Sequence, residues 1–408
     1  MWKKWKLLPV LLSLLFTGCW DRTDVDDIAI VVGLGIDKIP KENTILLSAQ
    51  IVNPADGKSP GSGEGTSFTV ITSQGQTFSD AIINFSKSYS KRMIYSHTKI
   101  VIMGRDFAKS DFSEALDFLQ RDRQFRENLW IFTADKSAKE IIQARMAAEN
   151  LPASGLDDMM GFLRENAFTV TTQLYDFIYR LKGDVAVSTS PYIKLVNEGK
   201  IMNEKLSRAT GKQITGTTFE IPEKIEIEET AIYKNNRFIG TIDKNDSRGL
   251  LWIRNQLKGG LVVILAQGEN QKPISIYITE GNSKITSSVK GRQVFMKIRC
   301  EGEAVLRDMG KLNIKATDPE VVKKLEQQTE QILLNRVERV ITKATKKFNA
   351  DFLGFSEHLH NQHPDQWHRI KKDWDEIFPN VEYDIDFKIT IQSNGLIKNP
   401  TLTKERRD

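Results

Sequence analysis

Four of the five histidines lie within eleven positions near the C-terminal end of the 408-residue chain: His358, His360, His363 and His368. Imidazoles so closely spaced could ligate zinc or nickel. No carboxylate or cysteine stands at a matching spacing to complete such a site, and the segment has the polar composition of a loop between two helices. The sequence therefore predicts a solvated loop here, with no metal site and no cofactor.

Residues 57–61 (GKSPG) match the G-x-S-x-G pattern of serine hydrolases. The serine of that pattern is a nucleophile only where it occupies a tight turn between a strand and a helix. In this chain it falls within residues 53–65, a Gly-, Pro- and Ser-rich stretch that we expect to be an exposed loop leading into another strand. His97, the remaining histidine, has no evident acidic partner. We therefore predict no catalytic residue, and a surface-anchored hydrolase is disfavoured.

Nucleotide and nucleic-acid binding are disfavoured as well. Gly33-Leu34-Gly35 follows a predicted strand, but the third glycine of a dinucleotide-binding loop is missing and Pro40 obstructs a helix start. The chain has 58 Lys and Arg against 53 Asp and Glu. Removal of residues 1–18, with three lysines, leaves 55 against 53, a net charge of +2. So small a net charge does not indicate the basic surface that nucleic-acid binding requires.

The N-terminus has the parts of an export signal. Lys3, Lys4 and Lys6 precede an apolar run at residues 7–16. That run has about half of the roughly 20 residues that a spanning helix needs, so it is typical of a signal peptide.

The residues that close this signal, Phe16-Thr17-Gly18-Cys19, resemble a bacterial lipobox, although Phe16 stands where leucine is usual. We therefore expect cleavage between Gly18 and Cys19. Cys19 is then expected to carry an S-diacylglycerol group and an N-acyl chain, and several acyl chains together form a stable membrane anchor.

The second cysteine and the tryptophans are predicted to be structural. With Cys19 acylated only Cys300 remains, so no intramolecular disulfide can form. Cys300 follows an alternating strand pattern and is expected to pack as a small hydrophobic residue. Trp252, Trp367 and Trp374 lie on amphipathic faces and are expected in the core.

The elements that position these residues differ between the two halves of the chain. In the first half we predict strands at 28–36, 44–52, 67–72, 95–103 and 129–133, and helices at 78–89, 112–119, 137–146, 157–165 and 171–181. These elements mix without regular strand–helix–strand alternation. An α+β fold with mixed or antiparallel sheets flanked by helices is therefore favoured over a doubly wound one.

In the second half, residues 224–233 and 238–242 flank two asparagines and predict a hairpin. A helix over 250–257 and strands over 261–266, 274–279, 284–289 and 294–300 follow. One long helix is expected from the N-cap Asp318 to a stop at Gly354, and a shorter amphipathic helix carries Trp367 and Trp374. The last predicted strand, 381–391, alternates strictly.

Length and composition indicate several domains. The chain is 40% apolar and 27% charged, which is typical of globular proteins and excludes collagen-like, purely coiled-coil and mostly disordered chains. We expect a signal peptide at 1–18 and an α+β domain at 19–196. A polar linker at 197–217 and a C-terminal α+β region at 218–400 follow. A division of that region into subdomains 218–290 and 291–400 stays open.

Several motifs resemble one family, the C-subunit lipoproteins of spore germination receptors. The resemblance begins at Gly18-Cys19-Trp20-Asp21-Arg22 and extends to about residue 391. The other matching pieces are IAIV at 28–31, GLGID at 33–37, SHTKIVIMG at 96–104, LQRD at 119–122 with Arg126, AIYK at 231–234, Gly240, RGLLW at 248–252, DFLGF at 351–355, and Trp367 with Trp374.

The resemblance implies a fold of several α+β domains and a non-catalytic function. It implies a lipid-anchored subunit of a nutrient germinant receptor in the inner membrane of the dormant spore. The subunit would lie on the side of that membrane that does not face the cytoplasm. The implied partners are two membrane-spanning subunits, of A and B type, and membrane lipid through Cys19. The family carries no established catalytic residues, so only Cys19 is transferred. The alternative is a solute-binding lipoprotein of a transporter, a class that usually has two lobes of repeated strand–helix–strand units. The sequence names neither the nutrient nor a ligand-binding residue.

Overall fold

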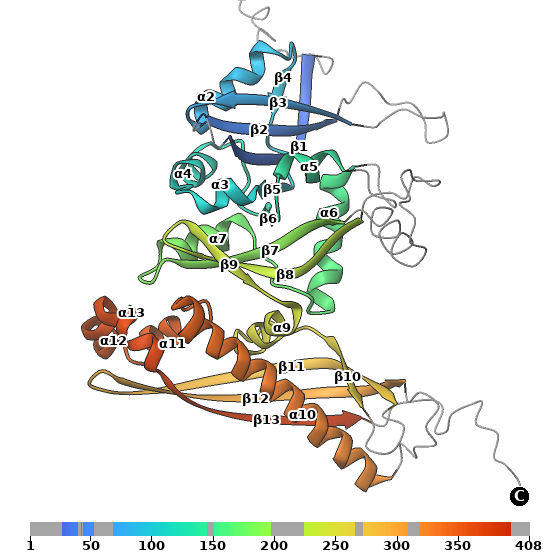
Figure 1. Cartoon of the computed structure of the whole chain (residues 1–408), viewed down its shortest axis with the longest axis vertical. Helices are drawn as coiled ribbons and strands as arrows, with labels where there is room; N and C mark the ends of the chain where they lie inside the picture. Colours follow the sequence, from blue (N-terminus) through green and yellow to red (C-terminus); the bar gives the residue numbers. More distant parts are fainter. Residues whose placement is uncertain are drawn as a thin grey trace, which may run out of the picture.

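A computed structural model describes residues 27–39, 42, 44–52, 68–144, 151–196, 224–265, 272–308 and 318–392. They form two α+β units stacked along the long axis of the molecule (Figure 1). The predicted α+β class with mixed sheets and one long helix in the second half is confirmed. No helix in the described ranges is long and apolar enough to cross a bilayer.

The first unit is built on a mixed sheet of nine strands in the order β3-β2-β1-β5-β6-β7-β8-β9, with β4 paired to the start of β1. Its centre is parallel, because β1, β5, β6 and β7 run in one direction, whereas the flanking pairs are antiparallel. The strands are β1 (Ile28–Ile39), β2 (Thr44–Val52), β3 (Thr69–Gly75), β4 (Arg92–Ile94), β5 (Ile100–Met103), β6 (Trp130–Ala134), β7 (Val187–Val196), β8 (Lys224–Lys234) and β9 (Arg237–Ile242).

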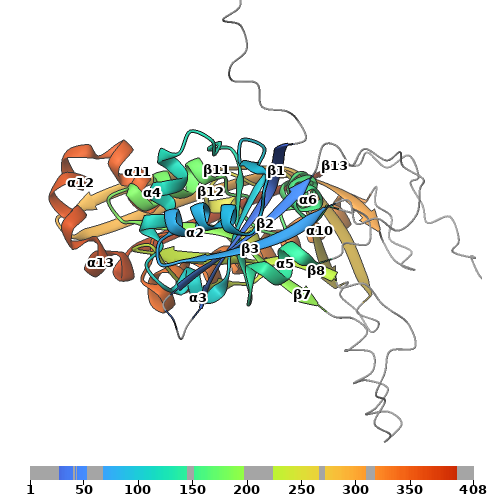
Figure 2. The same ribbon diagram turned by 90° about the horizontal axis from the view of Figure 1, so that it is seen from above.

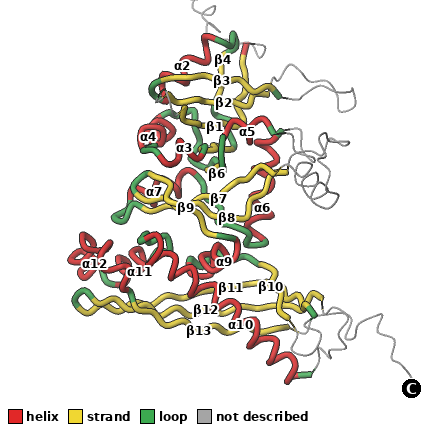
Figure 3. Tube along the Cα trace, viewed as in Figure 1, coloured by secondary structure: helices red, strands yellow, loops and turns green. Residues whose placement is uncertain are grey.

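Helices cover both faces of this sheet (Figure 3). One face packs against α2 (Phe78–Asn84), α3 (Arg105–Lys109), α4 (Ser113–Arg121) and α7 (Leu174–Lys182). The other face packs against α5 (Ala138–Gln143) and α6 (Pro152–Glu165). The central strands are therefore apolar on both sides, which explains the unbroken apolar run of β1.

The second unit is a four-stranded sheet in the order β10-β11-β12-β13, with helices on one face. Its strands are β10 (Gly260–Leu265), β11 (Pro273–Lys290), β12 (Gln293–Asp308) and β13 (Glu382–Gln392). Its helices are α9 (Lys244–Ile253), α10 (Pro319–Thr342), α11 (Phe355–Gln362), α12 (Pro364–Ile370) and α13 (Trp374–Ile377). Figure 2 shows α11, α12 and α13 gathered at one end of this sheet.

Local chemistry accounts for the elements that were predicted well. Asn235 and Asn236 have φ of 50° and 58° and join β8 to β9, as a tight hairpin turn requires. The Asp318 side chain accepts the N–H of Glu320 and caps α10. Along β13 the alternation predicted for 381–391 is present, with Ile389 and Ile391 buried and Lys388 and Thr390 exposed. Cys300, Trp252, Trp367 and Trp374 are all buried, as expected.

The boundary between the two sheets differs from the expected domain division. Strands β8 and β9 lie beyond the predicted linker, yet β8 pairs antiparallel with β7 along its length. The hairpin therefore completes the first sheet, and the second sheet begins only at β10. The linker residues 197–217 lie outside the described residues.

Three other expectations differ from the structure. Strand β7 was not predicted. Residues 274–289 form one strand, β11, in place of two, because the ladder to β12 continues through a bulge near Ile278. The long helix ends in a π-helical turn at Phe348, and Asn349 takes the left-handed conformation with φ of 43°. Gly354, the predicted stop, lies instead directly before α11.

Candidate functional site

The predicted lipidation and cleavage residues, Cys19 and Gly18, lie outside the described residues. The same holds for the GKSPG pattern at 57–61 and its loop at 53–65. The chain is described from Asp27, one residue before β1. The acylation of Cys19, the cleavage after Gly18 and the exposure of the 53–65 loop therefore stay predictions.

The histidine-rich segment is helical, which corrects the predicted loop. His358 and His360 lie on α11, His368 lies on α12, and His363 separates the two helices. The ring Nε2 of His363 is 2.8 Å from the carbonyl oxygen of Ser287 on β11. Burial lowers the pKa of His358. His363 thus takes part in packing this segment on the sheet, and the described part of the chain has no group of three or more side chains that could hold a metal ion.

One family-like motif, DFLGF at 351–355, is built around a buried carboxylate. Asp351 accepts backbone N–H groups from Gly354, Phe355 and Ser356 at 3.1, 3.0 and 2.7 Å. Its second oxygen also accepts the indole N–H of Trp374 at 3.3 Å. Asp351 therefore holds the start of α11 against α13, and its function is structural.

A second motif, RGLLW at 248–252, joins the two units. Gly249 faces α10 so closely that a Cβ would lie 2.6 Å from the carbonyl oxygen of Arg336. Arg248 donates to the carbonyl oxygens of Ala167 and Leu261, one from each unit. Trp252 is 1% exposed and lies over Gly281 and Gly302 in the second sheet.

Two more charged side chains stabilise this region, one within the second unit and one across the junction. Asp246 of α9 is fully buried and pairs with Arg339 of α10 and with Lys343, which begins the π-helical turn after α10. Arg254 donates to the carbonyl oxygen of Phe352 and to the hydroxyl of Thr189 on β7. Burial lowers the pKa of Arg254 to about 9. Arg248 of the RGLLW motif and Arg254 just beyond it therefore connect the two units, whereas Gly249 and Asp246 fix α9 on α10 within the second unit.

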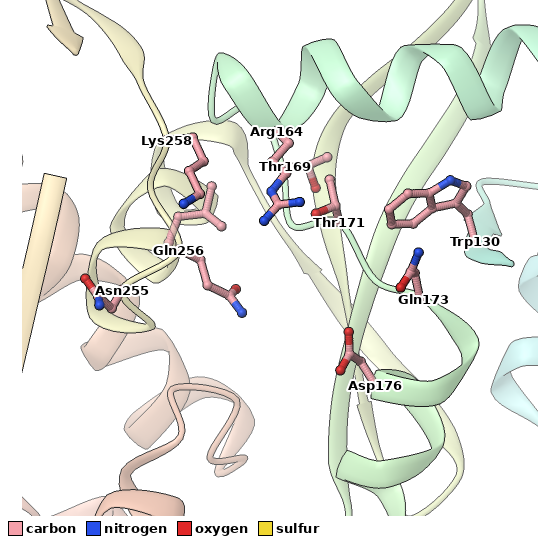
Figure 4. A pocket seen from close by; sticks show the side chains of 10 residues that line it. Trp130, Arg164, Thr169, Thr171, Gln173, Asp176, Asn255, Gln256 and Lys258 are labelled. Carbon is pink, nitrogen blue, oxygen red and sulfur yellow. The ribbon is translucent and has the colours of Figure 1, made fainter. Parts of the chain in front are cut away.

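A polar pocket of about 340 Å³ opens beside this junction. Figure 4 shows its lining side chains converging from both units. The first unit contributes Trp130, Arg164, Thr169, Thr171, Gln173 and Asp176, and the second contributes Leu251, Asn255, Gln256 and Lys258.

The positive and negative side chains of the pocket lie on different sides of it. Arg164 lies in the last turn of α6 and Lys258 follows α9. Both side chains point into the space, whereas Asp176 of α7 lies across it (Figure 4). Within the described ranges neither cation forms an ion pair. Two such cations beside amide and hydroxyl groups can bind an anionic group such as a carboxylate. Sequence reasoning missed this site, because its residues come from three separate stretches of the chain without a common motif.

Comparison with known protein families identifies the class of protein that has this two-unit fold. Residues 21–195 match the spore germination protein N-terminal domain, and residues 228–395 match the "Spore germination B3/ GerAC like, C-terminal" domain. These matches cover most of the chain. The chain therefore belongs to the GerAC-like family of spore germination proteins, and the resemblance found in the sequence is confirmed.

Individual relatives agree with this assignment. Spore germination proteins KC and B3 of Bacillus subtilis (strain 168) are 23% and 24% identical to this chain. The KC alignment covers 97% of this chain and 96% of the relative, and the B3 alignment covers 92% and 94%. The crystal structure of the GerBC protein is similar with a TM-score of 0.52 at 20% identity, and covers 88% of this chain and 96% of GerBC. The fold is therefore shared over nearly the whole length.

Proposed function

We propose that this chain is the lipid-anchored, non-catalytic subunit of a nutrient germinant receptor in the spore inner membrane. The observation that carries the proposal is the family match, which extends across both units. The lipobox-like residues 16–19 directly before the matched region support the anchor. In this function Cys19 carries the acyl chains, and the two units contact two membrane-spanning subunits, of A and B type. Confinement to one membrane raises their effective concentration, so weak contacts suffice.

The fold weighs against a solute-binding lipoprotein of a transporter. The two units of this chain differ in kind: one is a sheet covered on both faces, and the other a sheet with helices on one face. They do not form the paired, similar lobes that close over a solute in such proteins.

Deletion of the gene separates the two functions. A receptor subunit predicts that spores of the deletion strain fail to germinate with at least one nutrient, while solute uptake by growing cells is unchanged. Normal germination with every nutrient, accompanied by loss of uptake of one solute, would instead identify a transporter component.

The junction pocket is the part of this chain that we expect to bind a small anionic group within the receptor. Replacing Arg164 and Lys258 together with glutamine should raise the nutrient concentration for half-maximal germination at least tenfold, since charge-assisted hydrogen bonds contribute roughly 1.5–3 kcal/mol each. The melting temperature should stay within about 1 °C, because neither side chain has an ion-pair partner in the described residues. An unchanged nutrient response would exclude the pocket from nutrient sensing.

A further inference from the structure

One end of the first unit presents cations and an apolar side chain to solvent. This surface, named the tip, consists of Ile83, Lys87, Lys91 and Arg92. They lie at the end of α2, in the 3₁₀ turn Phe85–Lys87 and at the start of β4 (Figure 1). Ile83 is 67% exposed, Lys87 and Arg92 are exposed, and Lys91 is half-buried.

The tip is strongly basic for its size. No aspartate or glutamate occurs between residues 81 and 105, although the chain as a whole is nearly balanced. In the described ranges, none of the three tip cations forms an ion pair. Ion pairing among the described residues therefore does not account for these charges.

The tip lies where the chain enters the fold. Strand β4 pairs in parallel with the start of β1, so that Arg92 stands opposite Ile28. Cys19 precedes Ile28 by nine residues, which span at most about 30 Å when fully extended. If Cys19 is acylated, as the proposed function requires, the bilayer surface lies within that distance of the start of β1.

We propose that the tip binds anionic phospholipid headgroups and so orients the first unit on the membrane. Lysine and arginine heads interact with anionic lipid while their apolar stems and an exposed isoleucine enter the headgroup region. The short tether keeps the tip close to this surface, so three cations suffice where an untethered domain would need more. The second unit then points away from the membrane, since it lies at the opposite end of the long axis (Figure 1).

The tether itself offers a competing partner for these cations. Asp21, Asp24, Asp26 and Asp27 lie between Cys19 and Ile28. Pairing of the tip with these carboxylates would be independent of the lipid, whereas headgroup binding requires anionic lipid. The exposed Ile83 does not separate the two partners, because the tether also contains the apolar Trp20 and Val25; the dependence on anionic lipid separates them.

The test uses chemical attachment in place of natural acylation, so that it does not depend on whether Cys19 is acylated in the cell. A chain that begins at Cys19 is coupled through its thiol to maleimide lipid in vesicles. Cys300 is 1% exposed and burial raises the pKa of its thiol to about 12, so coupling is specific. One vesicle set contains phosphatidylcholine alone, and the other contains phosphatidylcholine and phosphatidylglycerol in equal amounts. Hydrogen exchange of residues 83–94 is followed on both.

Headgroup binding predicts exchange in this segment that is at least about fivefold slower on the anionic vesicles, and a loss of this slowing at high salt. The variant Lys87→Gln, Lys91→Gln, Arg92→Gln should weaken the contact about a hundredfold and abolish the protection. The control variant Lys323→Gln, Lys324→Gln, Arg369→Gln removes as much charge from exposed sites of the second unit and should keep the protection. Equal exchange on both vesicle sets, or equal loss in both variants, would overturn the proposal.

Discussion

Asp351→Ala should lower the free energy of unfolding by about 3 kcal/mol, and the melting temperature by roughly 4 °C. The substitution leaves three backbone N–H groups and the indole N–H of Trp374 without their acceptor in a buried region. Buried donors without partners carry their full desolvation cost, and the start of α11 also loses its cap. Thermal unfolding followed by circular dichroism measures the change.

The matched control is Asp384→Ala on the outer face of β13. This carboxylate is 58% exposed and lies 3.8 Å from Lys297, a geometry that contributes less than about 1 kcal/mol. A loss of stability at Asp351 no larger than that at Asp384 would contradict the structural function assigned to the DFLGF motif.

Gly249→Ala should destabilise the chain by about 2 kcal/mol or more, although alanine is the better helix former. A Cβ at Gly249 would lie 2.6 Å from the carbonyl oxygen of Arg336 and 3.1 Å from a methyl group of Val340. Because the first contact is with helix backbone, α9 and α10 must separate to make room. Denaturant unfolding of the purified chain measures the loss.

Gly161→Ala is the control for this prediction. Gly161 lies inside α6, and a Cβ there would meet nothing within 4 Å. Alanine should therefore stabilise the chain by about 0.5–1 kcal/mol through the lower entropy of its unfolded state. Changes of equal sign and size at the two glycines would refute the close contact between α9 and α10.

The elements that the sequence predicts well are those whose pattern is local. The apolar runs of β1 and β2, the paired asparagines at 235 and 236, and the Asp318 cap are each determined by neighbouring residues. The alternation of β13 is equally local, since one face of that strand is buried under α10 and the other is open to solvent.

The elements that were missed depend on distant partners. Strand β7 contains Ser188, Thr189 and Ser190, polar residues that are buried in the first sheet. The Ser190 hydroxyl is satisfied by Thr133, which lies 57 positions away in the sequence. The histidine segment was predicted as a loop because its polar composition hides the packing of Leu359 and His363 against the second sheet. No local pattern reveals such contacts.

The family could be recognised from the sequence alone. The junction between the two units and the pocket beside it could be found only in the structure. In the sequence, Asp351 and Gly249 were only parts of the family pattern, and their contacts explain why those residue types occur there. The pocket unites residues from 130 to 258, and the tip becomes apparent only when β4 is placed beside β1.

Confinement to the membrane through Cys19 is tested most directly by germination of a deletion strain. The strain expresses either the full chain or a chain that begins at Trp20 and is exported behind a signal that is cleaved without acylation. Both proteins should fold and unfold at the same temperature. We expect the full chain, retained in the membrane fraction, to restore nutrient-triggered germination and the unanchored chain to fail. Full rescue by the unanchored chain at an equal amount would contradict a lipid-anchored mode of action.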